Sequence, residues 1–186
     1  PRPETETIIR TLKNLNHSFN SCLEIGIGSA CIAITLYLEK IVHHIIGVDI
    51  SIECLRVARI NQKKYNINHL TLEKQDILTD SFNQKFDLIV SNPPYITGSE
   101  YAALPPHIKN FEPKVALTDQ KDGLMFYKRF AQLLPDILSP NGTFVCEIGK
   151  RHLIPKIKKL FINQGYKIEV QKDLNQDPRV LLIQSL

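Results

Sequence analysis

The sequence has few of the features that mark a membrane-embedded or secreted protein. No stretch approaches the ~20 uninterrupted apolar residues that a membrane-spanning helix needs, and the chain does not open with the basic and apolar segments of a signal peptide. These absences predict a soluble, cytoplasmic protein with no membrane partner. Methionine is scarce as well, because Met125 is the only one and residue 1 is proline. We therefore expect either an excised domain of a longer protein or a chain that has been trimmed.

Paired metal ligands are also missing. The cysteines lie singly in apolar segments and never form a C-x-x-C pair; they are Cys22, Cys31, Cys54 and Cys146. The six histidines are scattered, and His43 and His44 open an apolar run with no ligand partner nearby. We therefore expect reduced, buried thiols and no metal site.

The chain carries no strong net charge of either sign. The chain has 23 Lys and Arg against 19 Asp and Glu, a balance that permits contact with nucleic acid without arguing for it. Its 186 residues, 43% of them hydrophobic, suffice for one domain with a substantial core. Because no repeat or low-complexity linker interrupts it, we expect residues 1–186 to form a single domain.

What the sequence does contain is a regular alternation of apolar strands and amphipathic helices. Strands are predicted over residues 22–25, 44–48, 70–73, 86–90, 143–148, 166–170 and 180–183. Helices are predicted over residues 8–15, from the turn at 26–30 to about 38, after Ser51, over 124–138 and over 153–164. Such alternation predicts an α/β fold with a parallel sheet and helices on both faces, ending in an antiparallel pair.

Two of these helices carry more specific expectations. The helix after Ser51 should turn Cys54, Leu55, Ala58 and Tyr65 inward, since they share its apolar face. The helix over 124–138 contains Pro135, which should kink it or end it early.

The stretch from Asn92 to Tyr95 has the most suggestive chemistry. An apolar strand stops there at an amide side chain followed by Pro93 and Pro94, which cannot continue a central strand. The side-chain oxygen of Asn92 and the carbonyl of Pro93 could accept both hydrogens of a planar NH2 group while Tyr95 covers one face. The same residue types also form an ordinary strand-ending turn, and both interpretations remain open.

A second group of residues indicates a nucleoside ligand. In a doubly wound sheet, ligands bind at the carboxyl ends of the strands, where Gly26, Gly28 and Asp49 are expected. The glycines allow close approach of the backbone, and Asp49 is placed to accept hydrogen bonds from two ribose hydroxyls. Asp76, at the end of another strand, could accept from an adenine amino group with Ile77 packing on the ring, although Asp76 is equally explained as an ordinary loop acid.

The ligand is better predicted as S-adenosylmethionine than as a dinucleotide. Cys31 stands where a dinucleotide fingerprint has its third glycine, and Glu24 would repel a pyrophosphate. The cationic sulfonium and ammonium groups of S-adenosylmethionine are instead favoured by Glu24, Asp49 and Asp76.

Taken together, these motifs resemble the class I S-adenosylmethionine-dependent methyltransferases that modify planar nitrogens. The segments at residues 2–6 (Arg-Pro-Glu-Thr-Glu) and 111–117 (Phe-Glu-Pro-Lys-Val-Ala-Leu) narrow the resemblance to the catalytic domain of the HemK/PrmC family, the peptide chain release factor glutamine N5-methyltransferases. The resemblance covers essentially the whole chain. It implies a Rossmann-like, seven-stranded, mostly parallel sheet whose last strand is antiparallel.

The resemblance also implies a substrate and a set of site residues. The substrate would be the glutamine in the Gly-Gly-Gln loop of class 1 release factors, so direct nucleic-acid binding would not be required. The cofactor, leaving as S-adenosyl-L-homocysteine, would be held by residues that the motifs place at the loop and strand ends: Gly26, Ile27, Gly28, Ser29, Ala30, Asp49, Ile77 and Asn92. The acceptor glutamine would be held by Asn92, Pro93, Pro94 and Tyr95, with Glu112 also on the substrate side. Arg2, Pro3 and Thr5 would close over the cofactor.

The chain departs from the family pattern in three places. Ala30 replaces the usual third glycine of the loop, and His152 replaces a glutamine. Residues 173–179 lack the glycine and the Asp-Arg pair usual near the last strand, which puts a substrate role of that loop in doubt. The family's N-terminal helical domain is also missing.

Three rival functions share parts of this pattern. A methyltransferase acting on an exocyclic amino group of adenine or guanine in DNA or RNA would use the same Asn-Pro-Pro-Tyr motif, but such an enzyme usually carries a strongly basic recognition surface. A ribosomal-protein glutamine methyltransferase is expected to differ at residues 2–6. A nonenzymatic adenosine-binding module would not be expected to retain residues 92–95 intact.

Overall fold

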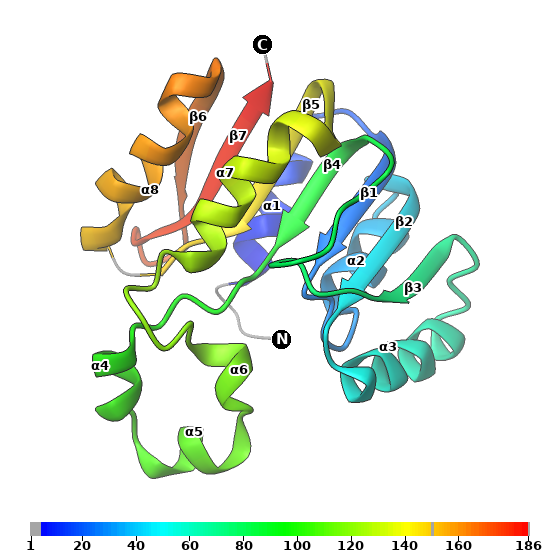
Figure 1. Ribbon diagram of the computed structural model, residues 1–186. Coiled ribbons are helices and arrows are strands. Elements are labelled where there is room, and N and C mark those ends of the chain that lie inside the picture. Colours follow the sequence, from blue (N-terminus) through cyan, green and yellow to red (C-terminus); the bar gives the residue numbers. More distant parts are fainter. Residues whose placement is uncertain (1–4, 150, 186) are drawn as a thin grey trace.

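The computed structural model describes residues 5–149 and 151–185. Over these residues the chain forms one seven-stranded sheet with helices on both faces (Figure 1). The strands are β1 (Phe19–Ile25), β2 (Val42–Asp49), β3 (Leu70–Lys74), β4 (Phe86–Ser91), β5 (Leu138–Glu147), β6 (Tyr166–Lys172) and β7 (Pro178–Ser185). The α-helices are α1 (Glu6–Lys13), α2 (Cys31–Leu38), α3 (Ile52–Lys64), α4 (Gly98–Ala102), α5 (Pro106–Phe111), α6 (Lys114–Leu117), α7 (Met125–Ile137) and α8 (Ile154–Phe161). The 3₁₀ turns η2 (Arg151–Leu153) and η3 (Ile162–Gln164) flank α8.

The strand order confirms the predicted fold class. The sheet runs β3-β2-β1-β4-β5-β7-β6, and the first five strands in this order are parallel. β7 is antiparallel to both of its neighbours, β5 and β6. The order reverses between β1 and β4, because β2 and β3 lie on one side of β1 and β5 lies beyond β4. Ligands of open α/β sheets bind at such a reversal, at the carboxyl ends of the strands.

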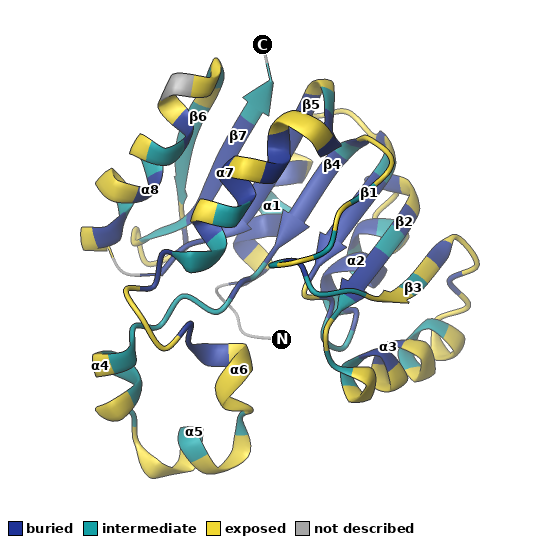
Figure 2. Cartoon of the chain, viewed as in Figure 1, coloured by how far each residue is buried: buried dark blue, intermediate teal, exposed yellow. Residues whose placement is uncertain are grey.

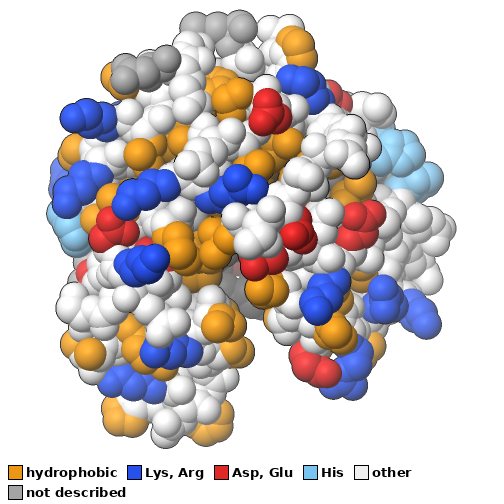
Figure 3. All heavy atoms as spheres, viewed as in Figure 1, with side chains coloured by type: hydrophobic (Ala, Val, Ile, Leu, Met, Phe, Trp, Pro, Cys, Tyr) orange, Lys and Arg blue, Asp and Glu red, His pale blue; other side chains and the backbone are white. Residues whose placement is uncertain are grey.

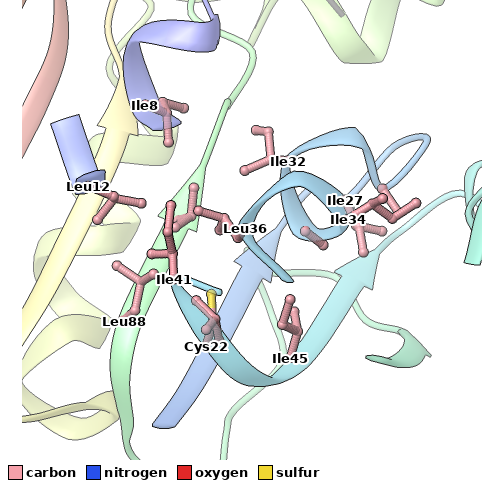
Figure 4. Packing of buried hydrophobic residues seen from close by; sticks show 14 of the residues in the cluster. Ile8, Leu12, Cys22, Ile27, Ile32, Ile34, Leu36, Ile41, Ile45 and Leu88 are labelled. Atoms are coloured by element: carbon pink, nitrogen blue, oxygen red, sulfur yellow. The ribbon is translucent and has the colours of Figure 1, made fainter. Parts of the chain in front are cut away.

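Two apolar layers sandwich the sheet. On one face, α1, α2 and α3 pack on β1, β2 and β4; Figure 4 shows Ile8 and Leu12 of α1 and Leu36 of α2 near Cys22 and Leu88 of the strands. On the other face, α7 and α8 cover β4, β5 and β7. The central strands are buried on both faces (Figure 2), as expected for parallel strands covered by helices.

The helix over 52–64 begins as predicted but ends one residue before Tyr65. The Ser51 hydroxyl accepts a hydrogen bond from the N–H of Cys54, which caps α3, and Leu55 and Ala58 are buried. Tyr65 is 48% exposed, so its predicted inward orientation is wrong. As the residue after the helix it leaves the helical backbone path (φ −99°, ψ 5°), and the amine of Lys64 lies 5.7 Å from its ring centre.

Pro135 is accommodated inside α7, which continues to Ile137. Proline has no N–H, so the carbonyl of Ala131 loses its helical donor, and the side-chain amide of Gln164 donates to that carbonyl instead (2.9 Å). The predicted helix is one residue too long at each end, because Leu124 is the N-cap of α7 and Leu138 already belongs to β5. Residues 140–142 form an irregularity within β5, where Phe86 pairs with Leu138 but Leu88 pairs with Thr143.

Residues 97–118 leave the sheet after β4 and form α4, α5 and α6. This excursion projects from the carboxyl-end side of the sheet (Figure 1). Thr97 and Glu100 form a reciprocal capping box at the start of α4, and the N–H of Ile96 donates to the carbonyl of Leu117 (3.0 Å) to close the excursion. Phe111 is 87% exposed there.

Candidate active site

The two motifs singled out in the sequence meet where the strand order reverses. β1 ends at Ile25 and enters the glycine loop, and β4 ends at Ser91 and enters Asn92. The buried Ser91 hydroxyl donates to the carbonyl of Ile25 (2.9 Å), which ties the two strand ends together. The glycine loop and the Asn-Pro-Pro-Tyr segment therefore lie side by side, as predicted.

The glycine loop opens a cradle above the end of β1. Gly26 and Gly28 have φ of +73° and +53°, a backbone region that other residues enter only with strain. A Cβ placed on either glycine would meet nothing within 4 Å, so both face open space. Ala30, at the third position, also takes a positive φ (+63°) and is fully buried. A small residue therefore does fit there, at the cost of backbone strain of about 1 kcal/mol.

Glu24 lies beneath this cradle and is almost completely buried. One of its carboxylate oxygens accepts a hydrogen bond from the N–H of Ala33 in α2 (2.8 Å). Burial raises the pKa of Glu24 to about 8, although the hydrogen bond from Ala33 opposes the shift, and the nearby negative charge of Asp49 adds to it. A cationic ligand beside Glu24 would stabilise its charged form.

Asp49 at the end of β2 is joined to the same loop. One carboxylate oxygen accepts from the N–H of Gly28 (2.9 Å) and the other from the N–H of Ser51 (2.9 Å). These bonds hold the carboxylate next to the glycine loop. Each oxygen keeps a further lone pair, so Asp49 can still accept from a diol.

A cavity of about 340 Å³ joins the cradle to the Asn-Pro-Pro-Tyr segment. This volume lies within the range of about 300–1,000 Å³ usual for small-molecule sites. Of the predicted site residues, those lining it are Thr5, Glu24, Gly26, Ile27, Gly28, Ser29, Asn92, Pro93, Tyr95 and Glu112. Its other walls were not predicted and are supplied by Cys31, Ile32, Ile96, Ala116 and Leu117.

Other predicted residues lie outside that lining. The Asp76 carboxylate accepts from the N–H of Leu78 (2.9 Å) and thereby shapes its own loop. Ile77 is 8% exposed and packs in the core under α7, and Asp49, Ala30 and Pro94 are also not among the residues that line the cavity. Arg2 and Pro3 fall outside the described residues.

The buried carboxylate of Glu147, which was not predicted to be a site residue, is hydrogen-bonded to two residues that line the cavity. Glu147, the last residue of β5, is 1% exposed. One of its oxygens accepts from the hydroxyl of Thr5 (2.8 Å), and the other accepts from the hydroxyl of Tyr95 (2.8 Å). The Thr5 oxygen in turn accepts from the side-chain NH2 of Asn92 (3.3 Å). The signal in the sequence was a lone acid at the end of an otherwise apolar strand.

A second, larger cleft of about 570 Å³ lies on the other side of Tyr95. Tyr95 and Ile96 line both spaces, so they form the wall between them. The remaining lining comes from α4 and its following turn, the loop after β5, and the start of β7: Glu100, Ala103, Leu104, Gly149, Arg151, Asp177, Pro178 and Arg179. A Cβ at Gly149 would lie only 2.7 Å from Cδ2 of Tyr95, so glycine is needed there for the ring to sit as it does.

The divergent loop at 173–179 is organised by Asp173. This carboxylate pairs with Arg179 (3.1 Å), so the loop does contain an Asp–Arg pair, formed between residues six positions apart. Burial opposes ionisation of Asp173, but hydrogen bonds from the N–H groups of Asp177 and Asn175 and from Arg179 outweigh it and lower its pKa. Gln176 supplies the positive φ (+66°) that glycine would adopt more easily.

Sheet order, glycine loop and strand-end acids together define a class I S-adenosylmethionine-dependent methyltransferase. The profile of the methyltransferase small domain matches residues 3–108. The chain is 38% identical over 190 residues to the release factor glutamine methyltransferase of Bacillus subtilis, covering 97% of this chain and 66% of that protein. It belongs to the methyltransferase small domain family and to the HemK/PrmC family of release factor glutamine methyltransferases.

A longer relative also matches the chain, and solved structures share its fold. The bifunctional methyltransferase of Rickettsia conorii is 38% identical over 172 residues, and the match covers 91% of this chain but 33% of that protein. This chain thus spans about a third of the Rickettsia relative. A methyltransferase from Pyrococcus furiosus has the same fold (TM-score 0.72, 22% identity, 97% of this chain and 83% of that one). So does the N-methyltransferase NodS of Bradyrhizobium japonicum in complex with S-adenosyl-L-homocysteine (TM-score 0.64, 14% identity, 98% and 85%).

The donor set of the cavity fits S-adenosylmethionine, the cofactor of this family. Glu24 lines the cavity and Asp49 is hydrogen-bonded to its glycine loop, and both acids suit a cation. The space above Gly26 and Gly28 is open to a ligand. Within residues 5–149 and 151–185, no group of three His, Cys, Asp or Glu side chains is arranged to hold a metal. No helix in the same described part of the chain is long and apolar enough to cross a membrane.

Proposed function

We propose that this methyltransferase modifies the side-chain amide nitrogen (N5) of a protein glutamine, namely the glutamine of the Gly-Gly-Gln loop in a class 1 peptide chain release factor. Its acceptor would be met in the cytoplasm, where translation ends. The observation that carries the proposal is the position of the Asn-Pro-Pro-Tyr segment: Asn92, Pro93 and Tyr95 line the cofactor cavity, and Tyr95 also lines the second cleft. A donor in the cavity and an acceptor that enters from the cleft would meet at this segment.

The acceptor side suits a planar amide. The carbonyl of Pro93 and the side-chain oxygen of Asn92 would accept the two N–H groups, and Tyr95 would lie against the amide. An amide nitrogen shares its lone pair with its carbonyl and is a poor nucleophile, so the main contribution of these residues would be orientation. Two acceptors would also stabilise the positive charge that develops on the nitrogen before it releases one proton.

On the donor side, we assign the cofactor to the glycine loop and the strand-end acids. The backbone of residues 26–30 would cover the ligand, Asp49 would accept from the ribose, and Glu24 would face its cationic end. Asp76 and Ile77 would bound the adenine, and Arg2, Pro3 and Thr5 would close over it. When bound, S-adenosylmethionine supplies a methyl group on a positively charged sulfur, which keeps the bonding electron pair as the methyl leaves.

The name of the Bacillus subtilis relative and the distribution of charge support a protein acceptor. The net charge is +4. On the face shown in Figure 3, Lys and Arg side chains are spread out with Asp and Glu among them, whereas a nucleic-acid enzyme is expected to gather its basic side chains. Glu112, which lines the cofactor cavity, and Glu100 and Arg151, which line the cleft, would face the incoming polypeptide.

Methyl transfer from labelled S-adenosylmethionine tests the acceptor class. A class 1 release factor, the same factor with its Gly-Gly-Gln glutamine replaced by alanine, total RNA and DNA should be offered separately. We expect label in the intact factor and none in the alanine variant. Label in RNA or DNA, with none in the factor, would assign the enzyme to exocyclic amino groups instead.

A further inference from the structure

The buried carboxylate of Glu147 has no part in the chemistry described so far, yet it bonds to two residues of the site. It lies on β5, a strand that carries no other proposed site residue. Thr5, before α1, and Tyr95 and Asn92, in the segment after β4, come from two other parts of the chain and are joined through it. A carboxylate this deeply buried costs free energy unless its oxygens are satisfied, so its partners are constrained in return.

The direction of each hydrogen bond in this chain of contacts is determined by the carboxylate. Both carboxylate oxygens of Glu147 accept, one from Tyr95 and the other from Thr5, so the Thr5 hydroxyl uses its single hydrogen to donate to Glu147. The Thr5 oxygen then has only lone pairs left for Asn92. It can accept from the NH2 group of Asn92, but it would repel the amide oxygen.

This arrangement selects one of the two orientations of the Asn92 amide. With the NH2 group turned to Thr5, the side-chain oxygen is turned away from it and serves as an acceptor. The flipped amide would require the Thr5 hydroxyl to donate to Asn92 instead. One oxygen of Glu147 would then lose its donor inside the protein, and a buried acceptor left without a donor disfavours the flipped amide.

We propose that Glu147 is a positioning residue that, through Thr5, keeps the Asn92 amide oriented with its oxygen toward the acceptor nitrogen. The inference rests on the proposed role of Asn92 in the function above. Glu147 also accepts a hydrogen bond from the Tyr95 hydroxyl. The same carboxylate therefore determines both the orientation of the Asn92 side-chain oxygen and the position of the Tyr95 ring beside it. Neither Thr5 nor Tyr95 could determine the orientation without it, because each hydroxyl can donate or accept.

The decisive variant is Glu147→Gln, which keeps the shape of the side chain but introduces a donor. An amide NH2 facing Thr5 would reverse the Thr5 hydroxyl and favour the flipped Asn92. We expect single-turnover methyl transfer at saturating cofactor to fall about 10- to 100-fold, while the Kd for S-adenosylhomocysteine changes less than about threefold. Equal losses of methyl transfer and cofactor binding would mean that Glu147 only supports the fold, and would overturn the proposal.

Two further substitutions separate positioning from stability. Thr5→Val removes the intermediate hydroxyl and should slow methyl transfer about 10- to 100-fold, as Glu147→Gln does; the conservative variant Thr5→Ser, which retains the hydroxyl, should recover most of that loss. The double variant Thr5→Val/Glu147→Gln should be no slower than the slower single variant, since both substitutions break the same connection between Glu147 and Asn92. A loss of rate in the double variant equal to the product of the two single losses would contradict the proposal. Tyr127→Phe is the matched control, because the Tyr127 hydroxyl donates to the backbone carbonyl of Glu147 (3.0 Å) and not to its carboxylate. It should lower thermal stability without slowing methyl transfer.

A measurement without an acceptor distinguishes this proposal from the proposed function. The side-chain NH2 resonances of Asn92, assigned by their loss in Asn92→Ala, should shift in Glu147→Gln and in Thr5→Val but not in Tyr127→Phe. If no release factor is methylated but these resonances respond as described, the substrate assignment fails and the positioning role stands. Unchanged resonances in Glu147→Gln and Thr5→Val would overturn the positioning role whatever the substrate is.

Discussion

Replacing Glu24 with glutamine should change how the stability of the folded chain depends on pH. The pKa of this buried carboxyl is raised from its ordinary value of 4.5 to about 8, chiefly by burial. Between these two values, the folded protein holds a proton that the unfolded chain has released. The contribution of Glu24 to stability is therefore greatest below about pH 4.5, falls as the pH rises and levels off above about pH 8.

The size of the effect follows from the same two values. At about 1.4 kcal/mol per pH unit, their difference corresponds to at most about 5 kcal/mol. Glu24 also lines an open cavity, and water that enters it reduces the penalty of ionisation, so we expect about 2–5 kcal/mol. That is a large part of the 5–15 kcal/mol by which a typical domain is stable.

Urea denaturation of the parent and of Glu24→Gln, from pH 5 to pH 9, measures this difference directly. Glutamine retains an oxygen that can accept from the N–H of Ala33 but has no proton to release. The variant should be similar to the parent at pH 5 and progressively more stable than it toward pH 9, with an unchanged m-value. If the stability difference stays constant within about 0.5 kcal/mol over this range, then Glu24 is not the perturbed acid and the reasoning is refuted.

Three further substitutions test other parts of the site. Asp49→Ala should weaken cofactor binding by about 1.5–3 kcal/mol, or one to two decades in the Kd from calorimetric titration with S-adenosylhomocysteine; no loss would exclude Asp49 from the ribose site. Asn92→Ala should slow single-turnover methyl transfer by about 10²–10³ while changing cofactor affinity much less, and a parental rate would mean that residues 92–95 are only a turn. Gly149→Ala would place a Cβ 2.7 Å from the Tyr95 ring. It should slow methyl transfer at least about tenfold in the same assay with cofactor affinity retained, and an unaffected rate would show that the ring position is unimportant.

The features that the sequence predicted well are those encoded by neighbouring residues. Alternation of strands and helices, the cap at Ser51 and the glycine turn at Gly26 each depend on a few consecutive side chains. Because the carboxyl ends of parallel strands meet at one edge of the sheet, the same local patterns also predicted that Asn92 would lie beside the glycine loop.

The features that were missed depend on partners distant in the sequence. Glu147 bonds to Thr5, 142 positions away, and to Tyr95, 52 positions away. No local pattern identifies such partners. Pro135 was expected to disturb its helix, and the amide of Gln164, 33 positions from the carbonyl it satisfies, was not foreseen. Tyr65 was assigned inward because it continued the apolar spacing, but the helix ends just before it.

The most direct test of the central claim is where the methyl group is attached. A class 1 release factor incubated with this chain and S-adenosylmethionine should be digested and sequenced by tandem mass spectrometry. We predict one added methyl group, located on the side chain of the glutamine in the Gly-Gly-Gln loop, in the parent reaction and its near absence with Asn92→Ala. A methyl group on any other residue of the factor, or equal methylation by Asn92→Ala, would contradict the claim that this site binds and orients a glutamine amide.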